Sequence, residues 1–411
     1  MRNQLVLDRC IEKGCVYSLS PKTFEKNLRE LNHSFSRIYK NTLVAYSYKT
    51  NYATSLLEIV EKLSMGHEIV SEMELNISKK IKASQNMIYF NGPIKTHASI
   101  KSVILNKGFI NIDSMEDVKL IEQICSKNNF IANVGIRLNF SIDDMPSRFG
   151  IDTNSDTLSI IISKLISNEK INFCGLHCHY AGRSLSHWET ITNKMIKFIQ
   201  SLDKQIISGL EYVSLGGGFY GPMPNSLFTQ LSSGKMPSYK DYASLIATQF
   251  KELTKKYENF NPKLIIEPGT AVVANSMKFY AAVRSVKKVN NKYIYTVDGS
   301  LFNLFGSINK PVDLPLSAIR NNTELKKNKD LNSIISGYTC IENDIISSNN
   351  KYELQVNDII EVDCVGSYSI VMKPPFIRQM PEIVSEDNHD DLTFIKIEET
   401  VEDVLSSFAN N

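Results

Sequence analysis

The stretch Val44-Ala45-Tyr46-Ser47-Tyr48-Lys49-Thr50-Asn51 is an apolar and aromatic run that ends in a single lysine. Its residue types favour a buried β-strand, and a parallel α/β sheet or barrel carries its chemistry at the carboxyl ends of such strands. Partial burial there would disfavour the charged form of the Lys49 amine and make it nucleophilic. A lysine of this kind suits a Schiff base, and an ordinary strand-end lysine in water is the alternative interpretation.

Strand-like runs alternate with segments of helical apolar spacing from residue 42 to residue 266. Ser114 and Asp117, for example, resemble the N-terminus of a helix. Eight such units over about 250 residues predict a (β/α)8 TIM barrel, and a doubly wound open sheet is the structural alternative. The expected strands are residues 42–48, 67–71, 87–90, 109–112, 132–138, 172–178, 211–215 and 263–266.

The pattern changes after about residue 280. Residues 279–289 and 292–297 read as short strands around the turn Asn290-Asn291, and residues 352–365 form a further β segment with no helix between them. The sequence therefore predicts a barrel domain over 25–280 and an all-β C-terminal domain, a β-sandwich or β-barrel, over 281–411. Residues 1–24 are expected to add their strand to that second domain. The polar segment 310–332 is expected to be a surface excursion.

Composition narrows the class of protein. The 411 residues are 42% hydrophobic with a net charge of +2, which gives no signal for nucleic acid or an anionic membrane. No apolar run reaches the roughly 18 residues of a membrane span, and the N-terminus lacks a secretory signal. Seven irregularly spaced cysteines indicate reduced thiols. We therefore expect a cytoplasmic enzyme. We also expect no metal site, because alternate residues of Cys174-Gly-Leu-His-Cys-His179 would face opposite sides of a strand.

Candidate chemical groups follow the later strands. Gly216-Gly217-Gly218 comes after the seventh strand, where backbone N–H groups without Cβ atoms in the way can approach a phosphate. Glu267 closes the eighth strand, and a buried carboxylate there needs a positive partner, either a pyridinium nitrogen or a base such as Arg137. His179 ends the sixth strand, with Ser184 at a helix start, and an imidazole there can stack on an aromatic ring. Taken singly, each of these features also has an ordinary structural explanation.

Together these pieces resemble a known family. The chain is similar to the pyridoxal-phosphate (PLP) decarboxylases of the alanine-racemase-like barrel fold, fold type III, which include the diaminopimelate, ornithine and arginine decarboxylases. The resemblance covers nearly the whole length and follows the family's order of motifs. The matching segments are Tyr46-Ser-Tyr-Lys49-Thr-Asn51, Glu68 to Leu75, Ser147-Arg-Phe-Gly150, Gly175 to His179, Gly216 to Gly218, Glu267-Pro-Gly269, Gly337 to Asp344 and Gly366-Ser-Tyr368.

The resemblance implies a role for each matching residue. Lys49 would hold PLP as a Schiff base, His179 would stack on its ring, and Glu267 would pair with the pyridine nitrogen and so favour the protonated, electron-withdrawing cofactor. Racemases of this fold place arginine at that position. The implied catalytic residues are Lys49, His179, Glu267 and Cys340, and the remaining implied cofactor contacts are Glu68, Ser184, Gly217, Gly218, Gly269, Thr270 and Tyr368.

The family also builds each site across a head-to-tail homodimer. By similarity, Cys340 of one subunit would protonate the carbanion in the other subunit's site, with Glu342 and Asp344 beside it as substrate contacts. A thiol suits this role because its ordinary pKa of about 8.5 can be tuned toward neutrality.

Two departures concern the substrate. Thr270 stands where the family's Glu-Pro-Gly-Arg pattern has arginine, and a second family arginine would fall near Gly306. Losing two guanidiniums would weaken recognition of a distal carboxylate. We therefore expect decarboxylation of an amino acid or amino-acid conjugate other than meso-diaminopimelate in a biosynthetic pathway. Diaminopimelate decarboxylase proper, an amino-acid racemase and a catalytically silent PLP-binding regulatory homologue are the alternatives.

Overall fold

The computed structural model describes residues 3–142, 146–304, 312–373 and 375–408. The chain forms two compact units. One consists of Lys26–Gly221 and Met236–Ala271, and the other consists of Met1–Glu25, Pro222–Lys235 and Val272–Asn411. We call them the barrel unit and the β unit.

Eight parallel strands close the barrel unit into a ring. Each strand pairs with the next in the order β2-β3-β4-β5-β6-β8-β9-β10, and β10 pairs with β2. Closure confirms the predicted TIM barrel, because a doubly wound open sheet would leave two edge strands unpaired. The strands are β2 Thr42–Ser47, β3 Gly66–Ile69, β4 Ile88–Phe90, β5 Phe109–Ile112, β6 Ala132–Asn139, β8 Ile171–His177, β9 Tyr212–Ser214 and β10 Lys263–Ile266, with the short β7 Ile151–Asp152 beside β6.

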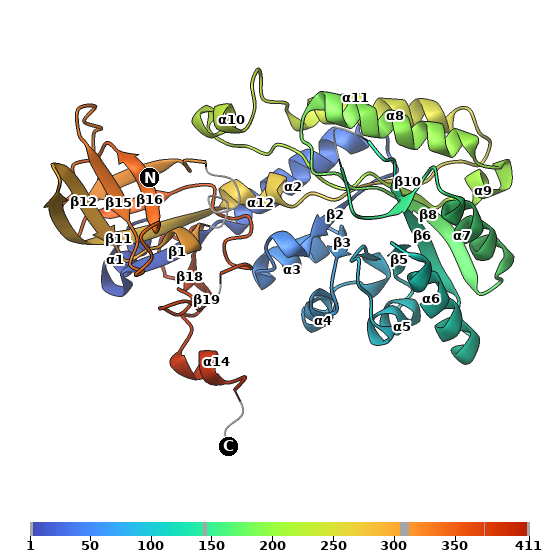
Figure 1. Cartoon of the computed structure of the whole chain (residues 1–411), viewed down its shortest axis with the longest axis horizontal. Coiled ribbons are helices and arrows are strands. Elements are labelled where there is room, and N and C mark those ends of the chain that lie inside the picture. Colours follow the sequence, from blue (N-terminus) through green and yellow to red (C-terminus); the bar gives the residue numbers. More distant parts are fainter. Residues whose placement is uncertain (1–2, 143–145, 305–311, 374, 409–411) are drawn as a thin grey trace. The chain divides into compact units, whose positions relative to one another are not determined.

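Helices follow the strands and surround the ring in Figure 1. Helix α6 begins as the sequence predicts, because the Ser114 side chain accepts a hydrogen bond from the backbone N–H of Asp117. The helices are α2 Pro21–Ser36, α3 Thr54–Lys62, α4 Glu72–Lys80, α5 His97–Leu105, α6 Met115–Asn128, α7 Asp156–Ser167, α8 Leu185–Ser201, α9 Lys204–Gly209 and α11 Tyr239–Thr254.

Aromatic side chains fill the barrel interior. The rings of Tyr89 and Phe109 stack with centroids 4.9 Å apart, and Tyr212 packs edge-on against both. The Tyr212 hydroxyl donates to Asn111 Oδ1 at 2.7 Å. A Cβ at Gly175 would lie 2.0 Å from Tyr212 Cζ, so only glycine leaves room for this ring. The barrel is therefore a packed core rather than a pore.

The β unit contains one branched mixed sheet. Strand β1 pairs antiparallel with β11 and parallel with β18, which confirms that the N-terminal strand joins the second sheet. The path of the sheet is β14-β13-β17-β11-β1-β18-β19, with β12, β15 and β16 branching from β11. The elements are α1 Gln4–Lys13, β1 Cys15–Leu19, α10 Asn225–Leu231, α12 Thr270–Val273, β11 Met277–Val289, β12 Lys292–Val297, β13 Leu316–Arg320, β14 Thr323–Glu324, β15 Ser333–Ser336, β16 Ile345–Asn350, β17 Ile359–Val362, β18 Ile383–Ser385, β19 Phe394–Lys396 and α14 Val401–Leu405.

The expectation that 310–332 is only a surface excursion was wrong. Strand β13 pairs with β17, and Ala318 and Ile319 are buried in the sheet. Asn321 and Asn322 both have positive φ and form the tight turn between β13 and β14, so the polar residues mark a hairpin. Residues 310 and 311 lie outside the described part of the chain.

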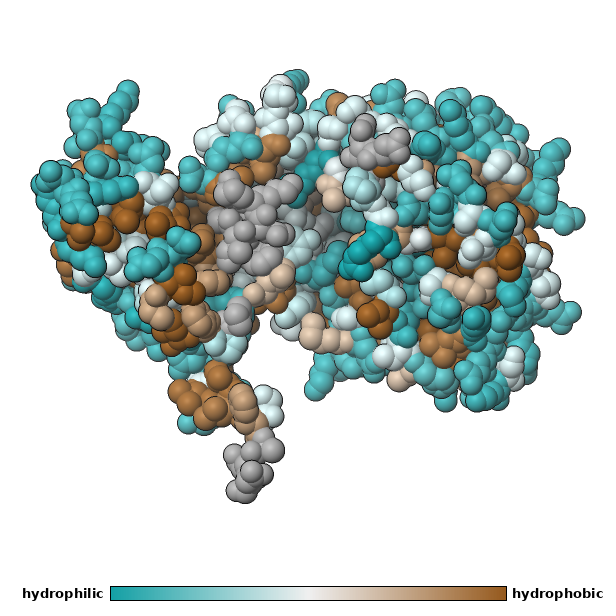
Figure 2. Space-filling model, viewed as in Figure 1, coloured by the Kyte–Doolittle hydropathy of each residue, from teal (hydrophilic) through white to brown (hydrophobic). Residues whose placement is uncertain are grey.

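Exposed apolar side chains gather in the C-terminal segment, where Figure 2 shows brown atoms at the place of α14 in Figure 1. Ile397, Val401 and Leu405 are exposed in this segment. Among the described residues, no helix has the length and apolar character needed to cross a membrane.

Candidate active site

Lys49 lies just beyond the carboxyl end of β2, in the single 3-10 turn η1 Tyr48–Thr50. Its Nζ is 2.6 Å from Glu68 Oε2, and Glu68 is buried on the neighbouring strand β3. The Lys49 side chain keeps 32% of its surface exposed. The amine is therefore held by a buried carboxylate and remains open to a small molecule.

Asn91 connects this lysine pair to Glu267. The Asn91 Nδ2 atom donates to Glu68 Oε1 at 3.2 Å and to Glu267 Oε1 at 3.0 Å. Asn111 Nδ2 in turn donates to Asn91 Oδ1 at 2.7 Å, which fixes the orientation of the amide. Lys49 and Glu267, which the sequence places at opposite ends of the strand series, are thus joined through two intervening side chains.

Glu267 is 4% exposed and directly follows β10. Ser214 Oγ donates to its Oε1 at 2.7 Å, and His177 Nε2 lies 3.2 Å from its Oε2. Burial by itself would raise the pKa of this carboxyl, but the charge of His177 and the hydrogen bonds from His177 and Ser214 hold the pKa of Glu267 below its ordinary value. The site therefore contains a buried ionised carboxylate.

His179 packs against the glycine loop. The backbone N–H of Gly217 donates to His179 Nδ1 at 2.9 Å. Burial, with a smaller effect from the Lys49 charge, lowers the pKa of His179 to about 3, so its imidazole is neutral at physiological pH. The neutral ring of His179 can offer a flat apolar face. His177 has a different role, because it contacts the Glu267 carboxylate.

The loop Gly216-Gly217-Gly218 follows β9 as the sequence predicts. Gly216 and Gly218 have φ of +73° and +113°, and a Cβ at Gly217 would lie 2.2 Å from the Glu267 carbonyl oxygen. These positions require glycine. A Cβ at Gly269 would similarly lie 2.0 Å from Thr50 Oγ1, in the turn that carries Lys49.

Ser184 caps helix α8, since its Oγ accepts a hydrogen bond from the His187 N–H at 3.1 Å. Thr270 is the first residue of α12. A cavity of about 870 Å³ lies beside His179, lined by Arg137, Pro146, Ser147, Arg148, Phe149, His179, Tyr180, Ala181 and Gly182. It offers room for a cofactor or substrate next to the imidazole.

A buried chain of side chains supports the turn that carries Lys49. The Tyr48 hydroxyl lies 3.0 Å from His67 Nδ1, and His67 Nε2 lies 3.0 Å from Glu61 Oε2. Ser84 then donates to Glu61 from both its backbone N–H and its hydroxyl. Because Tyr48 and His67 are fully buried, this chain fixes the residue directly before Lys49.

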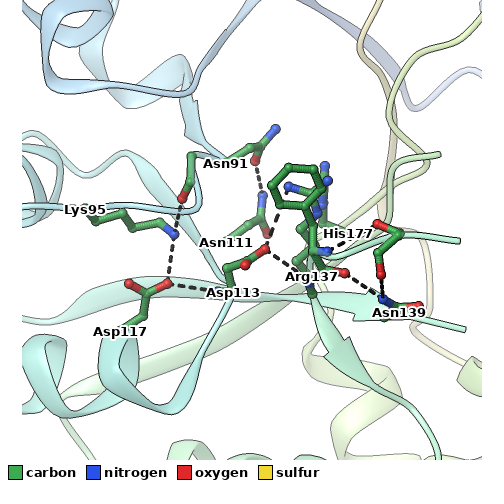
Figure 3. A network of polar contacts seen from close by, with 12 residues as sticks. Asn91, Lys95, Asn111, Asp113, Asp117, Arg137, Asn139 and His177 are labelled. Carbon is green, nitrogen blue, oxygen red and sulfur yellow. Dashed lines mark hydrogen bonds and ion pairs between the residues drawn. The ribbon is translucent and has the colours of Figure 1, made fainter. Parts of the chain in front are cut away.

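A second polar network occupies the neighbouring strand ends (Figure 3). Lys95 Nζ is 2.8 Å from Asp117 Oδ2 and donates to the Gly92 carbonyl. Arg137 pairs with Asp113 at 3.7 Å and lies over the Phe149 ring. Arg137 is thus engaged with Asp113, and His177 is the base that contacts Glu267.

The other predicted residues belong to the β unit. Cys340 is exposed in the connection between β15 and β16, and Glu342 is exposed beside it. Asp344 is buried, and its carboxylate accepts hydrogen bonds from Ser300, Leu301 and Thr339, so it organises the loop that carries Cys340. Its contact with substrate stays a prediction.

Tyr368 has φ of +68°, an uncommon conformation for a side chain of its size. It follows Gly366, where a Cβ would lie 2.0 Å from the Val273 carbonyl oxygen. The position near Gly306 lies outside the described residues.

Sequence reasoning missed Asn91, His177 and Ser214 as members of the site. Each of them ends or directly follows a barrel strand, namely β4, β8 and β9. Position at a strand's carboxyl end was the available signal, but Asn and Ser are also common turn residues.

Comparisons with known proteins identify relatives that cover most of this chain and share its fold. The chain is 26% identical over 375 residues to the diaminopimelate decarboxylase of Methanocaldococcus jannaschii, covering 87% of this chain and 82% of that protein. It is 23% identical to the diaminopimelate decarboxylase of Aquifex aeolicus, covering 84% and 80%. The crystal structure of the M. jannaschii enzyme in complex with L-lysine matches with a TM-score of 0.87 at 24% identity, covering 98% and 94% of the two chains.

The barrel carries a lysine, a buried carboxylate and a glycine loop at its strand ends, an arrangement that suits an enzyme of the PLP-binding class. The family model described as "Pyridoxal-dependent decarboxylase, pyridoxal binding domain" matches residues 22–274, more than half of the chain. The chain therefore belongs to the pyridoxal-dependent decarboxylase family. The donor set fits the cofactor, because PLP needs an amine for its aldehyde, an anion for its protonated ring nitrogen and N–H groups for its phosphate.

Proposed function

We propose that this enzyme removes the α-carboxyl group of an amino acid as CO2, with Lys49 as the covalent attachment site for PLP. When bound, PLP withdraws electrons from the carbon that loses the carboxyl group. The observation that carries the proposal is the chain Lys49, Glu68, Asn91, Glu267, which sets an amine and a buried ionised carboxylate in one polar network.

In this proposal each residue has a distinct task. Glu267 holds the proton on the ring nitrogen, and His177, Ser214 and Asn91 keep Glu267 ionised and oriented. The neutral imidazole of His179 contacts the ring face. The remaining cofactor contacts are Glu68, Ser184, Gly217, Gly218, Gly269, Thr270 and Tyr368.

The first candidate substrate is meso-diaminopimelate, because both relatives described above are diaminopimelate decarboxylases. The second candidate is an amino acid or conjugate without a carboxylate at its far end. Thr270 favours it, since threonine cannot form the bidentate pair that arginine makes with a carboxylate. The similarity to these relatives supports meso-diaminopimelate more strongly than the threonine at position 270 supports the second candidate.

We further propose a head-to-tail homodimer in which Cys340 of one subunit supplies the proton to the carbanion in the other subunit's site. Glu342 and Asp344 would then lie at the substrate end of that site. The exposure of Cys340 supports this role, because a buried thiol could not reach a substrate.

The test is CO2 release from a substrate panel of meso-diaminopimelate, ornithine, lysine, arginine and citryl- or carrier-linked amino acids. Turnover of meso-diaminopimelate alone supports the first candidate, and turnover of another member with little from meso-diaminopimelate supports the second. Lys49→Ala should abolish both CO2 release and the visible absorbance that borohydride bleaches. Borohydride-sensitive absorbance without CO2 from any substrate would instead indicate a silent PLP-binding homologue.

A further inference from the structure

Arg183 is held against the segment that follows the glycine loop. Its guanidinium lies over the Tyr220 ring at 5.7 Å, and its carbonyl accepts a hydrogen bond from the Tyr242 hydroxyl at 2.7 Å. The same Tyr242 hydroxyl accepts the N–H of Tyr220 at 3.2 Å. Tyr242 thus fixes Arg183 and Tyr220 to each other.

The glycine loop itself contacts the chain beside Arg183. A Cβ at Gly218 would lie 2.5 Å from the carbonyl oxygen of Gly182, so the two backbones are in close approach. Trp188 Nε1 donates to the Gly218 carbonyl at 2.9 Å, and its ring stacks on Phe219 with centroids 4.4 Å apart. Arg183 therefore belongs to the same rigid assembly as the loop.

The electrostatic balance of the barrel unit singles out this arginine. A phosphate group brings negative charge, and three cations near the strand ends already have carboxylate partners: Lys49 with Glu68, Lys95 with Asp117 and Arg137 with Asp113. Arg148, which also lines the cavity beside His179, lies over the Phe149 ring. His179 is neutral at physiological pH. Within the described residues Arg183 forms no ion pair with a carboxylate, so its charge is available to an anion.

We propose that Arg183 is the cation that binds the phosphate group of the cofactor at the glycine loop. This inference rests on the proposed placement of PLP and adds to it a residue that the family motifs do not assign. Arginine suits the task because its planar fork matches phosphate oxygens, and glycine N–H groups alone carry no net charge.

The experiment measures cofactor binding to apoprotein through the fluorescence of Trp188, the only tryptophan of the chain and a hydrogen-bond partner of the loop. Wild type, Arg183→Gln, Arg183→Lys and the exposed control Arg37→Gln are titrated with PLP and with pyridoxal, which lacks the phosphate. Arg183→Gln should weaken PLP binding about 10- to 100-fold and leave pyridoxal binding unchanged. Arg183→Lys should recover part of the loss, and Arg37→Gln should match wild type.

Competition with inorganic phosphate gives a second measurement. Phosphate should displace PLP less effectively from Arg183→Gln than from wild type. Equal weakening of PLP and pyridoxal would mean that Arg183 only supports the loop, and unchanged PLP binding would mean that it has no role; either result overturns the inference. Neither result affects the proposed decarboxylation, which the CO2 panel and Lys49→Ala test separately.

Discussion

Two buried carboxyl groups in the barrel unit have pKa values that are shifted in opposite directions. Glu267 is surrounded by His177, Ser214 and Asn91, and these donors keep it ionised. Glu74, in the first turn of α4, accepts a hydrogen bond from the backbone N–H of Val70. Burial, together with the nearby charge of Glu68, raises the pKa of Glu74 from 4.5 to about 7, and the Val70 hydrogen bond and the Lys49 charge oppose this rise in part. Both groups are buried, so neighbouring charges and hydrogen-bond donors, rather than burial, account for the difference between their pKa values.

Glu74→Gln should therefore change how stability depends on pH. Between pH 4.5 and 7 the folded protein holds the Glu74 proton that the unfolded chain has lost, so this residue makes stability fall as pH rises through that window. Above pH 7 the cost reaches at most about 3 kcal/mol. The variant lacks this cost and should gain stability relative to wild type between pH 5 and pH 8, as measured by urea unfolding.

The amide of the variant can still accept the hydrogen bond of Val70. Parallel pH dependences for the two proteins would show that Glu74 titrates normally.

At the scale of elements, the glycine loop and the eighth strand are in direct backbone contact. A Cβ at Gly217 would overlap the Glu267 carbonyl oxygen, whereas Gly209 at the end of α9 has no atom within 4 Å of the same added group. Gly217→Ala should therefore destabilise the protein by about 1–3 kcal/mol and weaken PLP binding. Thermal melting and PLP titration measure the two effects.

Gly209→Ala is the matched control for that substitution. Alanine removes conformational freedom from the unfolded chain and has the higher helix propensity, so this variant should gain up to about 1 kcal/mol and bind PLP normally. If Gly217→Ala had the same effects on stability and PLP binding as Gly209→Ala, the glycine loop would be flexible enough to accept a Cβ. That result would contradict a rigid phosphate site in this loop.

Strand and helix positions were largely predictable from the sequence. Six of the eight barrel strands differ from prediction by one or two residues at an end, and β5 and β10 have the predicted bounds. Local patterns suffice for this prediction, because a buried strand or a capped helix can be recognised from the residue types within a few positions. The hairpin β13–β14 was missed, since a short strand between polar turns has too few residues to show a period.

At the scale of the whole molecule, the proposed shared site makes subunit mixing informative. Lys49→Ala and Cys340→Ala should each be inactive alone, yet their co-expressed mixture should recover about a quarter of wild-type activity, because a mixed dimer would combine one intact barrel unit with one intact Cys340 loop. The CO2 assay on the unfractionated mixture checks this, and the purified mixed dimer, with one intact site of two, should reach about half of wild-type activity.

Lys49→Ala mixed with Glu267→Gln is the control, because both residues belong to the barrel unit and no intact site can form. Recovery in neither mixture would argue that each subunit carries a site of its own.

The sequence by itself determined the class of fold, the strand-end position of Lys49 and the order of the motifs, because these depend on local patterns that the chain carries residue by residue. Only the tertiary structure decided that His177, Asn91 and Ser214 surround Glu267, and that Arg137 turns to Asp113 instead. The reason is geometric: closing eight strands into a ring brings residues more than 170 positions apart, such as Asn91 and Glu267, within one hydrogen bond. No local pattern specifies which side chains meet across that ring.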